Sequence, residues 1–248
     1  MLMCWVMDVE AETLHEITPL IKTYNVYVLF SGGKDSLVAL HIVNRVACSL
    51  GKNITAVYVN TTASIPDNIK YVRKICRKFG VKLQIVQPKE SYFDLVRRWG
   101  FPTIGRRWCC FHLKIEPLKI YFSDNLDPLR IVFDGIRADE SARRQKFPRL
   151  GYHKHFESLC YHPIFYWTDE DVRAYAQKHG LFLNPLYELG FMRASECWCP
   201  VFKTLRQFQS MKQCYPEFFR KLVKLESELR SGGSMIYRNG RRIYLRDI

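Results

Sequence analysis

Residues 26–36 read Val26-Tyr27-Val28-Leu29-Phe30-Ser31-Gly32-Gly33-Lys34-Asp35-Ser36, an apolar run that ends at two glycines and a lysine. The run 26–30 is β-branched and aromatic, and it is short enough for a buried parallel strand. Apolar residues then recur over 36–50 along one face of a helix. The sequence therefore predicts a strand, a glycine turn and a helix in direct succession.

The turn between them has the chemistry of a phosphate site. Two adjacent glycines allow positive φ and let backbone N–H groups approach an anion closely. The following helix start adds its dipole and unpaired N–H donors, and Lys34 adds a mobile positive charge. It is not a Walker A loop, because Val28 stands where that motif has Gly and Asp35 where it has Ser or Thr. The alternative is a glycine turn that binds nothing.

The pattern continues as alternating strands and helices. Further strands are predicted at 54–59, 82–86 and 130–133, and further helices at 68–79 and 113–122. Such alternation implies a mostly parallel, doubly wound α/β sheet of the Rossmann-like kind. Ligands of such sheets bind at the carboxyl ends of the strands, where the strand order reverses.

The pattern changes after about residue 140. Residues 141–155 are rich in Arg, Lys and His, and we expect an exposed or ligand-covering loop there. Helices are predicted at 168–178, 204–213 and 216–229, and a β-hairpin at 235–245 around Asn239-Gly240. We therefore divide the chain into an N-terminal extension (1–24), a nucleotide-binding α/β domain (25–200) and a basic helical segment with a terminal hairpin (201–248).

Composition excludes several classes of protein. Hydrophobic residues make up 48% of the 248, which is too many for a disordered or fibrous chain. No apolar run approaches the ~20 residues of a membrane span, and the short run 1–7 does not have the form of a signal peptide. These features predict a soluble cytoplasmic protein. Lys and Arg exceed Asp and Glu by 38 to 24, and this net charge of +14 favours an anionic partner.

Nine cysteines in such a chain argue for thiols, metal ligation or redox chemistry rather than for disulfides. Four of them form two tight pairs, Cys109-Cys110 and Cys197-Trp198-Cys199. The other five have apolar or helical neighbours and are interpreted as small buried hydrophobic residues. They are Cys4, Cys48, Cys76, Cys160 and Cys214.

The six residues Ser31–Ser36 resemble the PP-loop of the adenine nucleotide α-hydrolases. Other segments narrow the resemblance to the phosphoadenosine phosphosulfate (PAPS) reductase family, over roughly residues 25–225. They are Cys109-Cys110 with 113–118, Gly135 to Arg144, Pro163-Ile164 with 167–172, Asn184 to Tyr187, and Cys197 to Pro200. The resemblance implies a sheet of the HUP type and an adenine nucleotide as ligand.

It also implies roles for individual residues. Lys34, Asp35 and Arg137 would be catalytic, and Asp35, Asp139 and Glu140 would help to hold Mg²⁺. Asn60-Thr61-Thr62 departs from the Asp-Thr-Gly that is usual at that position of the family. The residues expected to contact the nucleotide are Ser31, Gly32, Gly33, Lys34, Asp35, Ser36, Asn60, Thr61, Gly135 and Arg137.

The cysteine pairs carry a further implication. Sulfonucleotide reductases of the family hold a [4Fe–4S] cluster with a Cys-Cys pair and a distant Cys-x-x-Cys pair. Here Cys109, Cys110, Cys197 and Cys199 would be the ligands. The second pair is one residue tighter than usual, so ligation by three cysteines, Zn²⁺ or unligated thiols remain alternatives.

Three functions remain in competition. The first is ATP-dependent adenylation, releasing AMP and pyrophosphate, coupled to sulfur transfer onto a nucleic acid or nucleotide. The second is an assimilatory reductase of adenosine 5′-phosphosulfate (APS) or PAPS that releases sulfite. It requires a nucleophilic cysteine near the C-terminus, and residues 231–248 contain no thiol. The third is a non-catalytic nucleotide- or nucleic-acid-binding module, which the intact Lys34 and Arg137 disfavour.

Expected partners follow from these functions. Residues 203–248 carry eleven Lys and Arg against four Asp and Glu, which suggests tRNA or DNA as a partner. The alternative is an ordinary solvated basic helix face. A cysteine desulfurase or a thioredoxin-like protein would supply sulfur or electrons, and a homodimer is compatible with the sequence.

Overall fold

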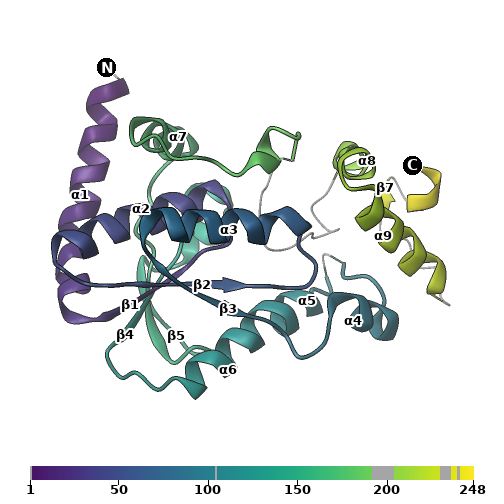
Figure 1. Cartoon of the computed structure of the whole chain (residues 1–248), viewed down its shortest axis with the longest axis horizontal. Coiled ribbons are helices and arrows are strands. Elements are labelled where there is room, and N and C mark those ends of the chain that lie inside the picture. The colour runs from purple at the N-terminus through teal and green to yellow at the C-terminus, as the bar shows by residue number, and fades with distance from the viewer. Residues whose placement is uncertain (1, 104, 192–203, 230–235, 239–240) are drawn as a thin grey trace.

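A computed structural model shows an α/β protein built on one six-stranded sheet (Figure 1). It describes residues 2–103, 105–191, 204–229, 236–238 and 241–248. The strand order is β3-β2-β1-β4-β6-β5, and every neighbouring pair is parallel except β5 with β6. The strands are β1 (Asn25–Leu29), β2 (Thr55–Val59), β3 (Lys82–Val86), β4 (Arg130–Phe133), β5 (Leu150–His153) and β6 (Ser158–Tyr161). The predicted fold class is confirmed.

The helices cover both faces of this sheet. They are α1 (Leu2–Thr23), α2 (Lys34–Ser49), α3 (Pro66–Phe79), α4 (Tyr92–Trp99), α5 (Trp108–Cys110), α6 (Glu116–Asp124), α7 (Asp169–Lys178), α8 (Leu205–Cys214) and α9 (Pro216–Glu228). A π-helical turn, Phe111–Ile115, joins α5 to α6. In Figure 1, α2, α3 and α7 lie on one side of the sheet and α6 lies on the other.

The strand order places the ligand site. From β1 the chain proceeds outward through β2 to β3, and it then returns to place β4 on the other side of β1. The carboxyl ends of β1 and β4 therefore flank the point where the order reverses, the usual ligand site of such sheets. The glycine turn follows β1, and Gly135 to Arg137 follow β4.

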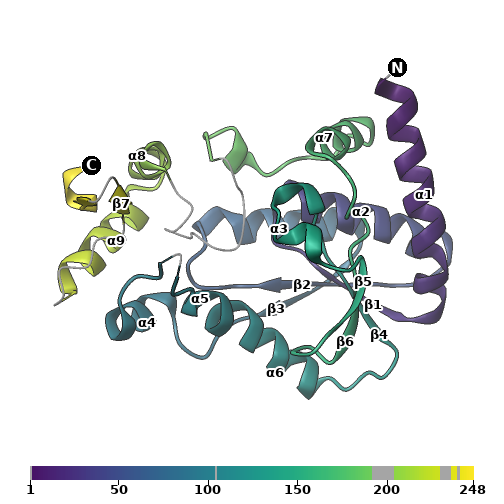
Figure 2. The same cartoon turned by 180° about the vertical axis from the view of Figure 1, so that it is seen from behind.

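Two large hydrophobic clusters organise the rest. The first joins one face of the sheet to α1, α2, α3 and α7. The second joins α4 and α5 to α8 and α9, through Tyr92, Phe208 and Leu222 among others. Figures 1 and 2 show α8 and α9 beside α4, at the end of the molecule away from α1. The proposed boundary near residue 200 remains a prediction, but α4 clearly shares a core with the C-terminal helices.

Some expectations need correction. Part of the loop predicted at 141–155 is strand β5, which forms the antiparallel edge of the sheet. Strand β6 and helix α4 were also missed: β6 has four residues and α4 has eight, although the apolar residues of α4 do recur along one face. The C-terminal hairpin has strands β7 (Ile236–Arg238) and β8 (Arg241–Ile243), but its predicted turn, Asn239-Gly240, falls outside the described residues. Among the helices that the structure does describe, none combines the length and hydropathy needed to span a bilayer.

The core on the α2 side should carry much of the stability. Leu37 is fully buried there, whereas Leu126 is 88% exposed. We expect Leu37→Ala to lower the free energy of unfolding by about 2–5 kcal/mol, because truncation leaves a cavity. Leu126→Ala, the matched control, should change it by less than about 0.5 kcal/mol. Urea denaturation measures both, and equal effects would contradict this core assignment.

Glu10 should make folding sensitive to acid. Its buried carboxylate contacts Arg45 Nη1 at 2.5 Å, Lys178 Nζ at 2.8 Å and His179 Nε2 at 3.1 Å. Burial alone would raise the pKa of Glu10, but hydrogen bonds from Lys178, Arg45 and His179 lower it from 4.5 to about 2. The folded-state pKa lies below the unfolded one, so this stabilisation is complete above about pH 4.5 and is lost as the pH falls towards 2.

We therefore expect Glu10→Gln to destabilise the protein at pH 7 and to lose less stability on acidification than the wild type. Unfolding by urea at several pH values between 7 and 3 measures this, with the exposed Glu12→Gln as control. Parallel pH profiles of wild type and Glu10→Gln would show that the Glu10 contacts do not stabilise the fold.

Candidate nucleotide site

The glycine turn is held in one conformation by two buried asparagines. Asn68 Nδ2, from α3, donates to the Ser31 carbonyl oxygen at 3.0 Å, and Asn184 Nδ2 donates to that of Gly32 at 3.1 Å. Asn184 also donates to Asn68 Oδ1 at 2.8 Å. These bonds occupy carbonyl oxygens that would otherwise repel an anion.

Gly32 is required at its position for two reasons. Its φ is +87°, a conformation that side chains rarely adopt, and a Cβ there would lie 2.5 Å from Asn68 Oδ1. The two serines of the loop close the turn: Ser36 Oγ donates to the Gly33 carbonyl oxygen at 3.0 Å and lies 3.0 Å from Ser31 Oγ. The backbone N–H of Lys34 donates to the Tyr187 hydroxyl at 3.0 Å. Contacts within the protein therefore hold the loop in this conformation.

Gly135 brings the end of β4 against the first turn of α2. A Cβ at Gly135 would lie 2.6 Å from the Ser36 backbone nitrogen and 2.7 Å from the Asp35 carbonyl carbon. Backbone atoms cannot yield to such a contact, so only glycine fits. This approach brings Arg137, two residues later, to the start of α2.

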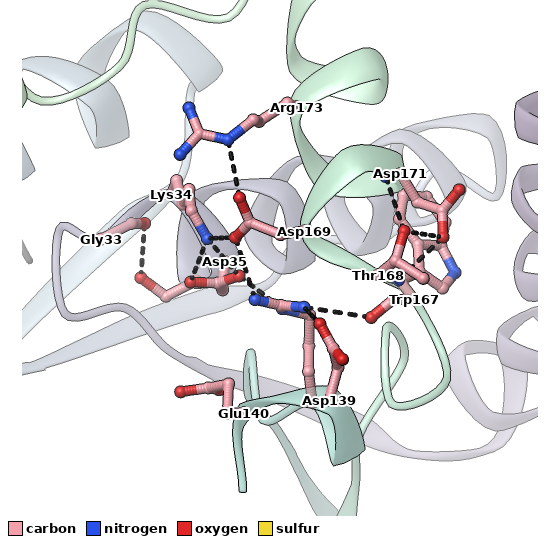
Figure 3. A network of polar contacts seen from close by, with 12 residues as sticks. Gly33, Lys34, Asp35, Asp139, Glu140, Trp167, Thr168, Asp169, Asp171 and Arg173 are labelled. Carbon is pink, nitrogen blue, oxygen red and sulfur yellow. Dashed lines mark hydrogen bonds and ion pairs between the residues drawn. The ribbon is translucent and has the colours of Figure 1, made fainter. Parts of the chain in front are cut away.

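A network of charges lies at the start of α2 (Figure 3). Lys34 Nζ contacts Asp35 at 3.1 Å and Asp169 at 2.5 Å. Arg137 donates through Nε to Asp35 at 2.6 Å, and through Nη1 and Nη2 to Asp139 and Asp169 at 3.2 Å each. Its side chain is only 4% exposed, so this guanidinium is a buried cation enclosed by three carboxylates.

The contacts of the network favour the charged forms of Asp169 and Arg137. Burial raises the pKa of Asp169, but hydrogen bonds from Lys34 and Arg173 outweigh it and lower that pKa to about 2. Burial lowers the pKa of Arg137, but its carboxylate neighbours, led by Asp35, raise it overall. Three cations, Lys34, Arg137 and Arg173, thus face the carboxylates of Asp35, Asp139 and Asp169.

This network borders a pocket of about 960 Å³, large enough for a nucleotide. One wall carries loop residues, namely Ser31, Gly33, Lys34, Asp35 and Ser36, and the end of β4 contributes Gly135, Arg137, Asp139 and Glu140. Apolar side chains, among them Val57, Leu118 and Phe156, also line the pocket. A cavity with both charged and apolar lining suits a ligand with phosphates and a base.

The first cysteine pair lines the same pocket. Cys109 is 3% exposed and Cys110 is exposed. The second pair, Cys197 and Cys199, falls outside the described residues. Within the part of the chain that the structure describes, no three His, Cys, Asp or Glu side chains are arranged to hold a metal ion.

The other predicted residues have different surroundings. Asn60 and Thr61 shape the turn after β2: Asn60 Oδ1 accepts from the Thr62 N–H, and Thr61 is fully buried. Neither they nor Gly32 line the pocket. Glu140 does line it and pairs with Arg144.

Sequence reasoning missed four site residues: Asn68, Asp169, Asn184 and Tyr187. Asp169 opens the helix that the Thr168–Asp171 capping pattern predicted, and Asn184 and Tyr187 belong to a segment quoted for the resemblance. For Asp169, Asn184 and Tyr187, the available signal was a polar side chain within a segment that resembles the family. For Asn68, the only signal was its position at the start of a predicted helix.

The contact at Gly135 generates a sharp test. Gly135→Ala should weaken binding of an ATP analogue at least tenfold and lower the melting temperature, because its Cβ forces β4 away from α2. Gly105→Ala is the matched control, since a Cβ there meets no atom within 4 Å. Calorimetric titration and thermal unfolding measure these effects. If both variants bind like wild type, the close approach does not shape the site.

Comparisons with known proteins identify relatives of this chain. A family model described as the phosphoadenosine phosphosulfate reductase domain matches residues 25–202. An uncharacterized protein of Methanocaldococcus jannaschii is 32% identical over 197 residues, which cover 79% of this chain and 40% of that protein. An APS reductase of Bacillus mycoides is 25% identical over 207 residues, covering 77% of this chain and 83% of the enzyme. The chain spans less than half the length of two M. jannaschii relatives.

Solved structures share the fold. A PAPS reductase of Candida auris superposes with a TM-score of 0.54 at 22% identity, covering 70% of this chain and 81% of that one. The U34-tRNA thiolase NcsA of Methanococcus maripaludis, solved with its [4Fe–4S] cluster, gives 0.53 at 15% identity, covering 87% and 78%. Since the family model matches most of the sequence, from β1 to residue 202, the chain belongs to the phosphoadenosine phosphosulfate reductase family.

Proposed function

We propose that this protein uses ATP to adenylate an oxygen of a nucleic acid or nucleotide, so that sulfur can then replace that oxygen. One observation supports the proposal above all others: the phosphate loop and the Cys109-Cys110 pair line the same pocket. Nucleotide activation and sulfur chemistry can therefore take place in one cavity.

In this reaction a substrate oxygen attacks the α-phosphorus, the bond between the α- and β-phosphates breaks, and pyrophosphate leaves. The positive end of the α2 dipole and the Lys34 ammonium would stabilise the departing phosphates. The oxygen now carries AMP, a good leaving group. Sulfur then attacks the substrate atom to which this oxygen is bonded, the bond from that atom to the oxygen breaks, and AMP leaves with the oxygen.

The charge balance of the network bears on Mg²⁺. Three cations already face three carboxylates in this network, so the network has no surplus positive charge to offset the negative charge of a triphosphate. Mg²⁺ bridging the phosphates would compensate for it. Asp139 suits this role best, because its side chain is 57% exposed and contacts Arg137 at 3.2 Å.

The thiols of Cys109 and Cys110 would provide half of a four-thiolate cluster site, with Cys197 and Cys199 as the expected remainder. A bound [4Fe–4S] cluster would supply an iron site that holds the incoming sulfur. NcsA, which is named a tRNA thiolase and contains such a cluster, supports sulfur transfer to RNA as a precedent on this fold.

A second candidate is reduction of APS or PAPS to sulfite with a thioredoxin-like donor. The APS reductase relative and the PAPS reductase structure support it. The sulfate group of the sulfonucleotide would then occupy the glycine loop in place of the pyrophosphate.

Product analysis distinguishes the two. Anaerobically purified protein with ATP, Mg²⁺, a sulfur donor and RNA or DNA should release AMP and pyrophosphate, whereas the same protein with APS or PAPS and thioredoxin should release no sulfite. Lys34→Met should lower turnover at least a hundredfold, because the ammonium that faces the leaving group is removed. Lys70→Met, whose side chain is 77% exposed, is the matched control.

Sulfite without AMP would overturn the proposal in favour of the reductase. The absence of both products would indicate a binding module. Equal turnover in Lys34→Met and Lys70→Met would show that the glycine loop is not where the leaving group is stabilised.

A further inference from the structure

The segment 141–155, here called the basic strap, forms one rim of the pocket. It contains five Lys and Arg and no Asp or Glu. Strand β5 is part of it and is the edge strand beside β6, as Figure 2 shows. Strap residues that line the pocket are Arg144, Phe147, Pro148, Gly151, Tyr152 and His153.

Two of the five basic side chains already pair with carboxylates of the protein. Arg144 pairs with Glu140, and Arg149 Nη1 donates to Glu16 Oε1 at 2.7 Å. The other three, Arg143, Lys146 and Lys154, are exposed. Within the described ranges, no carboxylate forms an ion pair with any of these three. The strap thus presents three uncompensated positive charges next to the pocket.

Exposed rings accompany these charges. Tyr152 is 64% exposed although it lines the pocket, so its ring lies at the pocket mouth. Phe111, next to Cys110, is 42% exposed, and its ring centroid lies 5.9 Å from that of His155 in the strap. The strap and the segment that follows Cys110 therefore meet at one rim of the pocket, and this rim carries exposed aromatic rings.

From this arrangement we propose that the basic strap binds a single-stranded segment of nucleic acid and stacks one base on Tyr152 at the mouth of the pocket. Cations without protein partners bind phosphates, and exposed aromatic rings stack on unpaired bases. A base inside a duplex cannot reach such a ring without leaving its stack. A single-stranded nucleic acid would be the substrate class of the proposed function, and the biological role of the strap rests on that function. Nucleic-acid binding by the strap can be measured independently of AMP formation.

The test compares two triple variants of matched composition. Arg143→Gln/Lys146→Gln/Lys154→Gln removes the strap charges. Arg73→Gln/Lys78→Gln/Lys82→Gln removes one Arg and two Lys from exposed positions on α3 and β3, at the opposite edge of the sheet. Fluorescence anisotropy with a labelled single-stranded RNA, the same sequence as DNA, and a duplex measures affinity at several salt concentrations. Binding of an ATP analogue checks that each variant is folded.

The strap variant should bind single strands at least tenfold more weakly than wild type. For the strap variant, the slope of log K against log salt should be shallower by about 2, because each of three phosphate contacts contributes ~0.7 to this slope on single strands. The control variant should stay within twofold of wild type. Tyr152→Ala should weaken binding several-fold without changing the salt slope, and Tyr152→Phe should retain wild-type affinity because it keeps the ring.

Three results would overturn the inference: no single-strand binding by wild type, equal loss in the two triple variants, or equal affinity for duplex and single strand. A preference between the RNA and DNA strands would identify the substrate. If binding depends on the strap but no AMP forms, the proposed function is refuted and the inference about the strap stands. If AMP forms but the strap variant binds as tightly as wild type, the inference about the strap is refuted and the proposed function stands.

Discussion

The close approach of Gly135 to the first turn of α2 is the constraint on which the site depends. A single Cβ at this position would lie 2.6 Å from the Ser36 nitrogen. Because the backbone passes so near, Arg137 reaches Asp35 and is buried among carboxylates. The glycine turn after β1 and the arginine after β4 therefore form one unit, although about a hundred residues separate them.

The wider network around that unit balances three cations, Lys34, Arg137 and Arg173, against three carboxylates. Lys34 and Arg137 are positioned by Asp35 and Asp169, so their charges are fixed in place before a nucleotide binds. Such preorganisation reduces the reorganisation needed when charge develops on a leaving group. It also means that a polyphosphate must compete with Asp169 for Lys34, which favours ligands that bring their own cation.

The central sheet and the loop could be predicted from the sequence because their signals are local. Val26–Phe30 is an apolar run, and Gly32-Gly33-Lys34 follows it directly. Asn68 and Asp169 could not be predicted in this way, since their roles arise only when α3 and α7 pack beside α2. Strand β5 was missed because Gly151 and an exposed Tyr152 do not form an apolar strand pattern. The Cys109-Cys110 pair was found, and its place in the pocket wall required the structure.

The central claim is that the loop after β1 binds the phosphates of an adenine nucleotide. The most direct measurement is a crystal structure of the protein with a non-hydrolysable ATP analogue and Mg²⁺. The account predicts the β- and γ-phosphates at the glycine turn and the start of α2, with the Lys34 ammonium in contact. Phosphates bound elsewhere, with the Lys34–Asp169 pair undisturbed, would contradict it.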